Sequence, residues 1–450
     1  MSDDRRPPIA RRPLLVCGPC RWMEPWYVSM FLTSISIGGM LPILLPFVVA
    51  ARLGTPSAVA YVMATFGLGQ IVAPMLGRFA DESGQHKLLF ILTLIVMALS
   101  VAPLAVVQSD WAFVGWAGIA GITVSGTSTL SNLLIVEFHS RTEWEPRIGW
   151  LQTVNGAGQV LGLALAAFFV AHSVAGFLVA ACLIALAVPF LLLGVVRPNP
   201  AKTRGAIDRE MIAAAVREID IRLVARFAHR EQVGDGILRS SYHHLQAARD
   251  YVRRRGLKTP FGAFVLSWFV WIFGGSAFFA YLPLLFRDSF GVSPRVISMV
   301  FAVSAAISLF LFPLAASACR RFGPTLVYRA GMLLRALGYV TVGLAMMVHG
   351  AADYGVVGFS VLAACWPLLI VSGSDLTAHL GATEEGAAFG VFNAAGAVAS
   401  VVGTLTGAPV MEYFGYAGLA WLGVGGLLAA LMIAAAAPVV RVQPDMETVR

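Results

Sequence analysis

Charged residues are rare inside the long apolar stretches of this sequence, so the few that occur there are the first candidates for chemistry. Asp375 is the clearest acidic example, and Arg329 is expected at a similar depth of the neighbouring stretch. We expect the two side chains to form a gate pair. A proton-binding carboxylate and a solvated, interfacial one are the alternatives for Asp375. Arg335 lies deeper in its own stretch, and its role has no account from the sequence.

Uncharged side chains supply the candidates for binding a solute. The stretch that contains Trp268 and Trp271 is rich in aromatic residues, which could stack on an apolar or aromatic molecule or simply face lipid. Amide side chains could orient the same molecule, or could hydrogen-bond between helices. These candidates are Gln70, Asn132, Gln152, Asn155, Gln159 and Asn393.

Several kinds of chemistry have no supporting motif. The sequence contains no Gly-x-Ser-x-Gly, His-Glu-x-x-His or Walker loop, so we expect neither an enzyme nor an ATP-driven pump. The adjacent His243 and His244 have no second ligand cluster, and no metal or cofactor is expected. Cys17-Gly18-Pro19-Cys20 resembles a redox tetrapeptide, but no βαβ pattern surrounds it, and we interpret the match as chance.

The composition is that of a membrane protein. Of the 450 residues, 58% are hydrophobic and 12% are charged, about half the charged share of a soluble domain. The apolar residues form blocks of about 20, the length that crosses a bilayer as a helix. The net charge of +8 lies between the blocks, as topology signals do, and does not indicate nucleic-acid binding.

The blocks predict an all-α polytopic protein with twelve transmembrane helices. The predicted segments are 26–50, 57–76, 88–107, 111–136, 148–171, 173–196, 261–286, 294–315, 326–347, 354–378, 387–410 and 416–437. Arginine and lysine gather on one side of this arrangement, which predicts that both termini are cytoplasmic. The expected domains are a tail (1–25), a six-helix bundle (26–196), a linker (197–260), a second bundle (261–437) and a tail (438–450).

The linker is basic and contains an amphipathic helix. Ile212, Val216, Ile219 and Leu223 recur at helical spacing, with arginines on other faces. We interpret it as a helix lying under the bundle or on the anionic inner leaflet, with a regulatory or partner-binding role as the alternative.

The two predicted bundles repeat one another. Pro46 and Gly54 correspond to Pro283 and Gly291, both at an offset of 237 residues. Gly38-Gly39 likewise corresponds to Gly274-Gly275, and Asn155-Gly156-Ala157-Gly158 to Asn393-Ala394-Ala395-Gly396. Duplication of a six-helix unit is typical of secondary transporters. The spacings Gly158-x-x-x-Gly162 and Gly403-x-x-x-Gly407 indicate close helix packing.

A polar stretch between the second and third segments carries a family resemblance. Its matching positions are Gly77, Ala80, Asp81, Gly84 and Lys87. This stretch resembles the signature loop of the major facilitator superfamily, in which it stabilises one face of the transport cycle. Glu82, Gln85 and His86 stand where the family usually has basic residues. Glu137 and Arg147 also match recurrent family positions, whereas the second equivalent loop, Pro313 to Pro324, has decayed.

The resemblance implies a secondary transporter of a small organic solute. We expect a monomer in the inner membrane, in contact with lipid, that exports apolar or weakly polar compounds, with a proton as a candidate coupling ion. The arginine that proton-coupled drug antiporters carry in the fourth helix is absent here. Uptake of a sugar-like or other metabolite is the alternative, and a transporter-like sensor acting through the linker is another.

Overall fold

The chain forms helices throughout the part that the computed structural model describes. These residues are 24–83, 86–138, 144–194, 259–348, 351–380 and 385–436. The first half comprises α1 (Trp26–Ser34), η2 (Ile35–Met40), α2 (Leu41–Leu53), α3 (Pro56–Ser83), α4 (His86–Val101), η3 (Ala102–Ala105), α5 (Asp110–Phe138), α6 (Trp144–Phe169), η5 (Val170–His172) and α7 (Ser173–Gly194). The second comprises α11 (Pro260–Phe290), α12 (Pro294–Phe322), α13 (Pro324–Ala345), α14 (Ala352–Leu380) and α15 (Glu385–Ala436).

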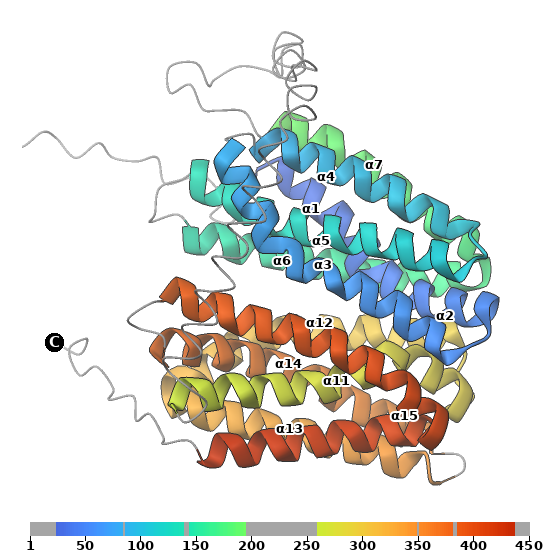
Figure 1. Cartoon of the computed structure of the whole chain (residues 1–450), viewed down its shortest axis with the longest axis vertical. Helices are drawn as coiled ribbons and strands as arrows, with labels where there is room; N and C mark the ends of the chain where they lie inside the picture. Colours follow the sequence, from blue (N-terminus) through green and yellow to red (C-terminus); the bar gives the residue numbers. More distant parts are fainter. Residues whose placement is uncertain are drawn as a thin grey trace, which may run out of the picture.

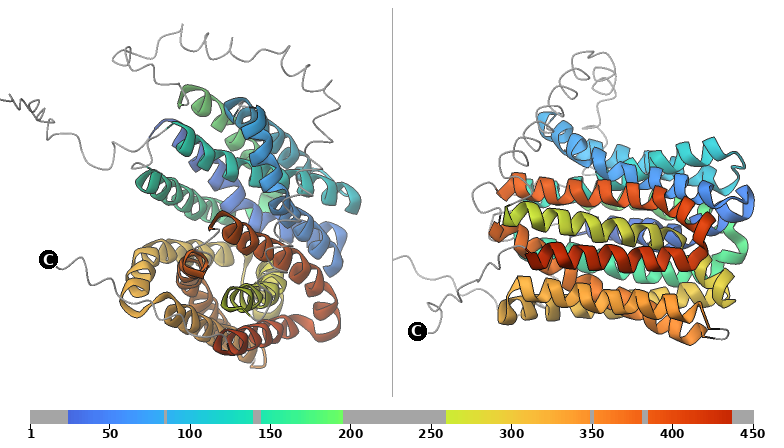
Figure 2. Two further views of the ribbon diagram at one scale, coloured as in Figure 1. Left: turned by 60° about the vertical axis from the view of Figure 1, so that its left-hand side comes forward. Right: turned by 60° about the horizontal axis from the view of Figure 1, so that its bottom comes forward.

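The helices lie in two groups side by side. Figure 1 shows α1–α7 (blue to green) above α11–α15 (yellow to red), with the helices of both groups running across the view. Figure 2 (left) views the second group nearly end-on, with α11 (yellow-green) inside the ring that the other helices form. Between the groups, α3 packs on α15 and α6 packs on α12.

Length and hydropathy qualify eight segments of the described chain to span a membrane. Two of them, Arg147–Gly194 and Ala388–Ala436, are 48 and 49 residues long. Since one crossing needs about 20 residues, each holds enough helix for two. The breaks occur at η5 and at Gly415, where φ is 66°. Most of each of the twelve predicted segments lies on helices of the described chain, and residues 106–107 and 346–347 fall just beyond a helix end. Twelve crossings and the domain boundaries stay predictions.

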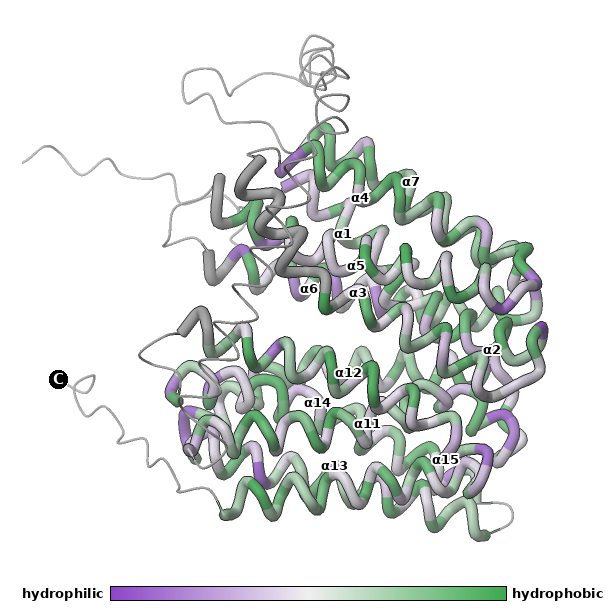
Figure 3. Tube along the Cα trace, in the orientation of Figure 1, coloured by the Kyte–Doolittle hydropathy of each residue, from purple (hydrophilic) through white to green (hydrophobic). Residues whose placement is uncertain are grey.

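Apolar surface covers the length of the helices. In Figure 3 hydrophobic residues follow the helices, and most of the hydrophilic residues gather at their ends. Large side chains such as Phe310, Leu337 and Met432 are 78%, 61% and 68% exposed. Because water would make such exposure costly, these side chains indicate a surface covered by lipid.

The helices extend beyond the apolar blocks that predicted them. The motif stretch, expected as a loop, is helical from Gly77 to the end of α3 at Ser83, and α12 likewise continues to Phe322 rather than stopping near Ala315. Hydropathy marks only the apolar part of a helix, whereas the backbone hydrogen bonds continue until a residue such as Gly323, with φ of 81°, ends them.

The predicted duplication is visible in equivalent helix ends. Gly54 ends α2 with φ of 69°, and Gly291 ends α11 with φ of 64°. Both positions lie in the left-handed region that favours glycine. Pro46 and Pro283 lie inside the same two helices. The correspondence read from the sequence therefore reflects equal structural roles.

Candidate functional site

The first helix of each group is held against a glycine-rich partner. A Cβ added at Gly162 of α6 would overlap the backbone of Ile35 and Gly39, both within the π-helical segment η2. A Cβ added at Gly403 of α15 would overlap the backbone of Phe273 in α11. Both predicted packing motifs are confirmed. They place the two elements most central to the site, η2 and α11, within backbone contact of their neighbours.

Three of the amide candidates, Gln152, Gln159 and Asn393, are exposed on helices that pack on the other group. Gln152 is exposed on α6, four residues before Gly156, which faces Leu309 of α12 in the other group. Asn393 is exposed on α15, the helix that packs on α3. Asn132 of α5 is partly exposed and donates to the Ser128 carbonyl of its own helix, at 2.9 Å. Gln70 lies on α3, and its side chain is outside the described set.

Asn155 occupies a different environment from the other amides. Its backbone carbonyl accepts a hydrogen bond from the Ser34 hydroxyl of α1, at 2.6 Å. Its side-chain Oδ1 is buried without a hydrogen-bond partner. A buried oxygen with an unmet bond is a candidate for receiving a donor from a bound molecule. Among the amide candidates, Asn155 is therefore the one whose side-chain oxygen is available to accept a hydrogen bond from a bound molecule.

The tryptophan candidates are buried in the second group rather than exposed to a solute. Trp268 and Trp271 of α11 are 3% and 2% exposed, with ring centroids 4.9 Å apart in an edge-to-face contact. Trp268 also packs on Phe392 of α15, at 4.3 Å. Trp271 lies 6.2 Å from Trp366 of α14, which is 39% exposed. The prediction missed Trp366, although it is the exposed member of this array.

The structure does not bring Asp375 and Arg329 together. The Asp375 carboxylate lies 3.0 Å from Nδ1 of His379, one turn later on α14, and about a third of the carboxylate side chain is exposed. Arg329 instead donates to the Ala434 carbonyl at the end of α15, at 2.6 Å. The sequence interpretation overlooked His379, whose spacing of four residues from an aspartate is a signal for a helical pair.

The motif residues lie at one end of the first group. Gly77 and Asp81 are in the last turns of α3, and Lys87 is the second residue of α4. Lys87 is partly buried and takes part in an interaction of its own. Gly84, the linker 197–258, Cys17 and Cys20 lie outside the described residues, as do the side chains of Asp81 and Glu137.

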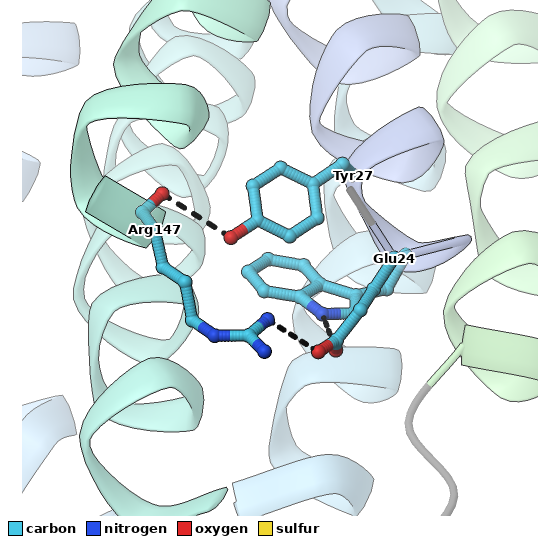
Figure 4. Close-up of polar contacts among 4 residues, drawn as sticks. Glu24, Tyr27 and Arg147 are labelled. Atoms are coloured by element: carbon cyan, nitrogen blue, oxygen red, sulfur yellow. Dashed lines mark hydrogen bonds and ion pairs between the residues drawn. The ribbon is translucent and has the colours of Figure 1, made fainter. Parts of the chain in front are cut away.

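A polar cluster at this same end ties α1 to α6 (Figure 4). Arg147 forms an ion pair with Glu24 at 2.5 Å, and its side chain is 10% exposed. Glu24 also accepts a hydrogen bond from Nε1 of Trp26, at 2.8 Å. The hydroxyl of Tyr27 donates to the Arg147 carbonyl, at 3.2 Å. The sequence drew attention to Arg147 but not to Glu24, which precedes the first apolar block.

Contacts between the groups include two at the opposite end. Arg287 of α11 lies over the Phe47 ring of α2, with Cζ 5.5 Å from the ring centroid. Arg295 of α12 lies over the Phe168 ring of α6, at 5.4 Å. In the described part of the chain, cation–π contacts between the groups occur at this end. In Figure 1 α3 also approaches α15 toward this side, on the right.

The two helix groups contact each other mainly through α3–α15 and α6–α12. A family model for the Major Facilitator Superfamily matches residues 26–404. The chain belongs to the major facilitator superfamily. This is a family of transporters rather than of enzymes, and the resemblance inferred from the motif is confirmed.

Solved structures agree with this assignment at the level of the fold. The nucleoside transporter NupG matches with a TM-score of 0.66 at 13% identity, over 92% of this chain and 98% of that one. A bacterial homologue of the human lysosomal transporter Spinster, in an inward-facing and occupied conformation, gives 0.65 at 13%, over 91% and 94%. The xylose transporter XylE from E. coli, inward open, gives 0.62 at 17%, over 91% and 93%. No curated protein matches the sequence.

Proposed function

We propose that this transporter exports apolar or weakly polar organic molecules across the cytoplasmic membrane by alternating access. The observation that carries the proposal is the set of amide side chains exposed on α6 and α15, the helices that pack on the other group. Gln152, Gln159 and Asn393 are exposed there, with Trp366 on α14 as an exposed aromatic neighbour of the buried tryptophans. Such a surface suits a molecule that needs few polar contacts and much apolar burial.

The cation–π contacts support the alternating-access part of the proposal. Arg287 and Arg295 join the two groups at the end remote from the motif residues. With the orientation that the arginines predict, this end is extracellular. We infer on this basis an inward-facing state, which binds a molecule from the cytoplasm or the inner leaflet.

Asp375 and His379 are the candidates for proton coupling. They form an ion pair within α14, with side chains 34% and 44% exposed, so both reach solvent in this state. Cys319 of α12 is the titratable neighbour that faces Asp375 from another helix. A carboxylate and an imidazole in contact can exchange one proton as the site opens and closes.

The test is a stability screen followed by flux. Purified protein is heated with panels of hydrophobic drugs, sugars and metabolites. A ligand present at about 100 times its dissociation constant adds roughly 2.7 kcal/mol to the free energy of unfolding. The expected hits are hydrophobic and leave everted vesicles against a gradient only when the protein is present.

Other outcomes favour the other functions. Hits confined to sugars or polar metabolites, with uptake into right-side-out vesicles, would replace export by uptake. A protein that transports no hit, but loses its cellular effect when residues 205–255 are deleted, would be a sensor.

A further inference from the structure

Arg335 is a buried charge that the proposed function leaves unused. It lies in the middle of α13, is 3% exposed, and donates through one terminal nitrogen to the Leu362 carbonyl of α14, at 3.0 Å. No aspartate or glutamate of the described chain forms an ion pair with it. A charge at such depth costs several kcal/mol when it has no counter-charge.

Four aromatic rings from three helices surround the guanidinium. Its Cζ lies 5.2 Å from the Trp271 ring and 5.1 Å from the Phe279 ring, both of α11. It lies 5.9 Å from the rings of Tyr339 and Trp366, of α13 and α14. We call Arg335 and these four residues the arginine cage. Cation–π attraction contributes roughly 0.5–2 kcal/mol for a ring and offsets part of the desolvation.

The hydrogen bond from Arg335 to α14 uses only one of the N–H donors of the guanidinium. Pro367 deprives the Ala363 carbonyl of its usual helical partner, and the Ser308 hydroxyl of α12 donates to that carbonyl instead, at 3.1 Å. Arg335 donates to the adjacent Leu362 carbonyl and so braces the same irregular turn. A guanidinium has five N–H donors, and a glutamine or lysine could provide this one bond.

Three buried polar groups of the arginine cage make no well-formed hydrogen bond: Nε of Arg335, the hydroxyl of Tyr339 and Nε1 of Trp271. Two of them have a polar neighbour, since the Tyr339 hydroxyl lies near Arg335 and Nε1 of Trp271 lies near the Tyr328 hydroxyl. Nε of Arg335 lacks an acceptor, and a negatively charged acceptor would satisfy both this donor and the charge. The planar fork of a guanidinium matches a carboxylate through two parallel N–H···O bonds.

One of the four aromatic rings of the arginine cage is exposed. Phe279 is partly buried and Trp271 and Tyr339 are fully buried, whereas Trp366 is 39% exposed. The Trp366 ring faces α11, since its centroid lies 6.2 Å from that of Trp271. A molecule that reaches Trp366 is therefore one aromatic ring away from the guanidinium.

We propose that the arginine cage binds the carboxylate of the transported molecule while its aromatic body stacks on Trp366. The substrate class is then an aromatic organic acid, mostly apolar with one negative charge. This inference rests on the proposed function, because it specifies the molecule that the same protein exports. It also accounts for Arg335 on a helix that is otherwise apolar in its middle.

The test compares a carboxylate with its neutral analogue. Binding of 1-naphthoate and of 1-naphthamide to the purified full-length protein is followed by thermal shift and by quenching of tryptophan fluorescence. We expect wild type to bind the acid and Arg335→Gln to bind it at least ~10-fold more weakly, since hydrogen bonds to a charged group contribute about 1.5–3 kcal/mol. The amide is expected to bind weakly to both.

Further variants keep the test decisive if Arg335→Gln fails to fold. Arg335→Lys keeps the charge but loses the fork, and Tyr339→Phe removes only a hydroxyl; both are expected to weaken naphthoate binding several-fold. Arg320→Gln, which removes an exposed arginine of α12, is the matched control and should bind like wild type. Equal affinity for acid and amide, or full affinity in the folded cage variants, would overturn the proposal.

Chloride distinguishes a carboxylate from a small inorganic anion. A thermal shift with chloride relative to gluconate, without any response to naphthoate or benzoate, would show a halide site and overturn the carboxylate assignment.

The experiments also distinguish failure of the cage proposal from failure of the export proposal. Naphthoate binding without any flux leaves the cage standing and removes export, whereas export of neutral compounds by a protein that binds no acid removes only the cage.

Discussion

At the scale of single residues, ion pairs at the ends of helices have different roles. The Glu24–Arg147 pair is mostly shielded from water and is joined by the Trp26 indole, so its bonds are charge-assisted and well ordered. The Asp375–His379 pair reaches solvent, with side chains 34% and 44% exposed. We therefore expect the first pair to affect stability and the second to affect the response to pH.

Loss of the Glu24 carboxylate should destabilise the protein. Glu24→Gln removes the negative charge that contacts the Arg147 guanidinium, whose side chain is 10% exposed. The expected loss is about 1–3 kcal/mol in the free energy of unfolding, seen as a lower melting temperature. Glu412→Gln, which removes an exposed carboxylate of α15, is the control and should change stability by less than about 0.5 kcal/mol. Equal melting temperatures for the two variants would contradict the assignment.

Neutralising Asp375 should uncouple transport from the pH gradient. In Asp375→Asn no carboxylate remains at this place to carry a proton, whereas Nδ1 of His379 keeps the backbone carbonyl of residue 375 as a partner, at 2.8 Å. Vesicles with an imposed pH gradient should then fail to accumulate substrate, while downhill flux continues. Asp353→Asn, at the opposite end of the same helix, is the matched control. Concentrative transport in the Asp375 variant would exclude this residue as the coupling site.

At the scale of helices, glycine positions decide how closely neighbours approach. A methyl group at Gly162 or Gly403 would meet backbone atoms, which cannot move aside as a flexible side chain can. By contrast, a Cβ at Gly149 of α6 or at Gly390 of α15 would meet nothing within 4 Å. The same two helices thus provide both the sensitive positions and their controls.

Alanine should separate the two kinds of glycine. Gly162→Ala and Gly403→Ala are expected to cost about 1–3 kcal/mol each, because the helices must separate. Gly149→Ala and Gly390→Ala should be neutral or slightly stabilising, since alanine is the better helix former. Melting temperatures in one detergent provide the comparison. A tolerated alanine at both packed positions would show that the helices slide easily past one another.

The helices could be predicted from the sequence, because apolar blocks and glycine or proline positions are local signals. The duplication was predictable for the same reason, as the paired glycines at 54 and 291 show. The contacts between side chains on different helices could not be predicted from the sequence. The Asp375–Arg329 pair was inferred from equal depth alone, but the rotation of each helix placed Arg329 against the Ala434 carbonyl. The arginine cage escaped prediction because its rings come from three helices and share no spacing in the sequence.

At the scale of the whole molecule, the contacts at one end oppose opening of that end. Arg287 over Phe47 and Arg295 over Phe168 each join the two groups through one cation and one ring. At roughly 0.5–2 kcal/mol for each contact, their sum is comparable to the free-energy differences that separate transport states. They can therefore hold the end closed without making the opposite state inaccessible.

Removal of one ring should shift the balance between the two states. In Phe47→Leu the position stays apolar, but the attraction for Arg287 is lost, and a loss of about 1 kcal/mol changes the ratio of states about five-fold. Spin labels at Ala51→Cys and Ser289→Cys, in a background without the five native cysteines, report the separation of the groups at this end. Both positions are exposed. We expect pulsed electron resonance to show a larger share of long distances in the variant.

The control for this experiment is a cation–π contact that does not join the groups. Arg321 lies over the ring of its neighbour Phe322, at 5.3 Å, at the end of α12 remote from the labels. Phe322→Leu should leave the distance distribution unchanged. If Phe47→Leu also leaves it unchanged, the cation–π contact does not hold the end closed. The closure must then come from the packing of α3 on α15 and α6 on α12, and a larger residue at Gly67, which faces Val401 of α15, becomes the change that should open it.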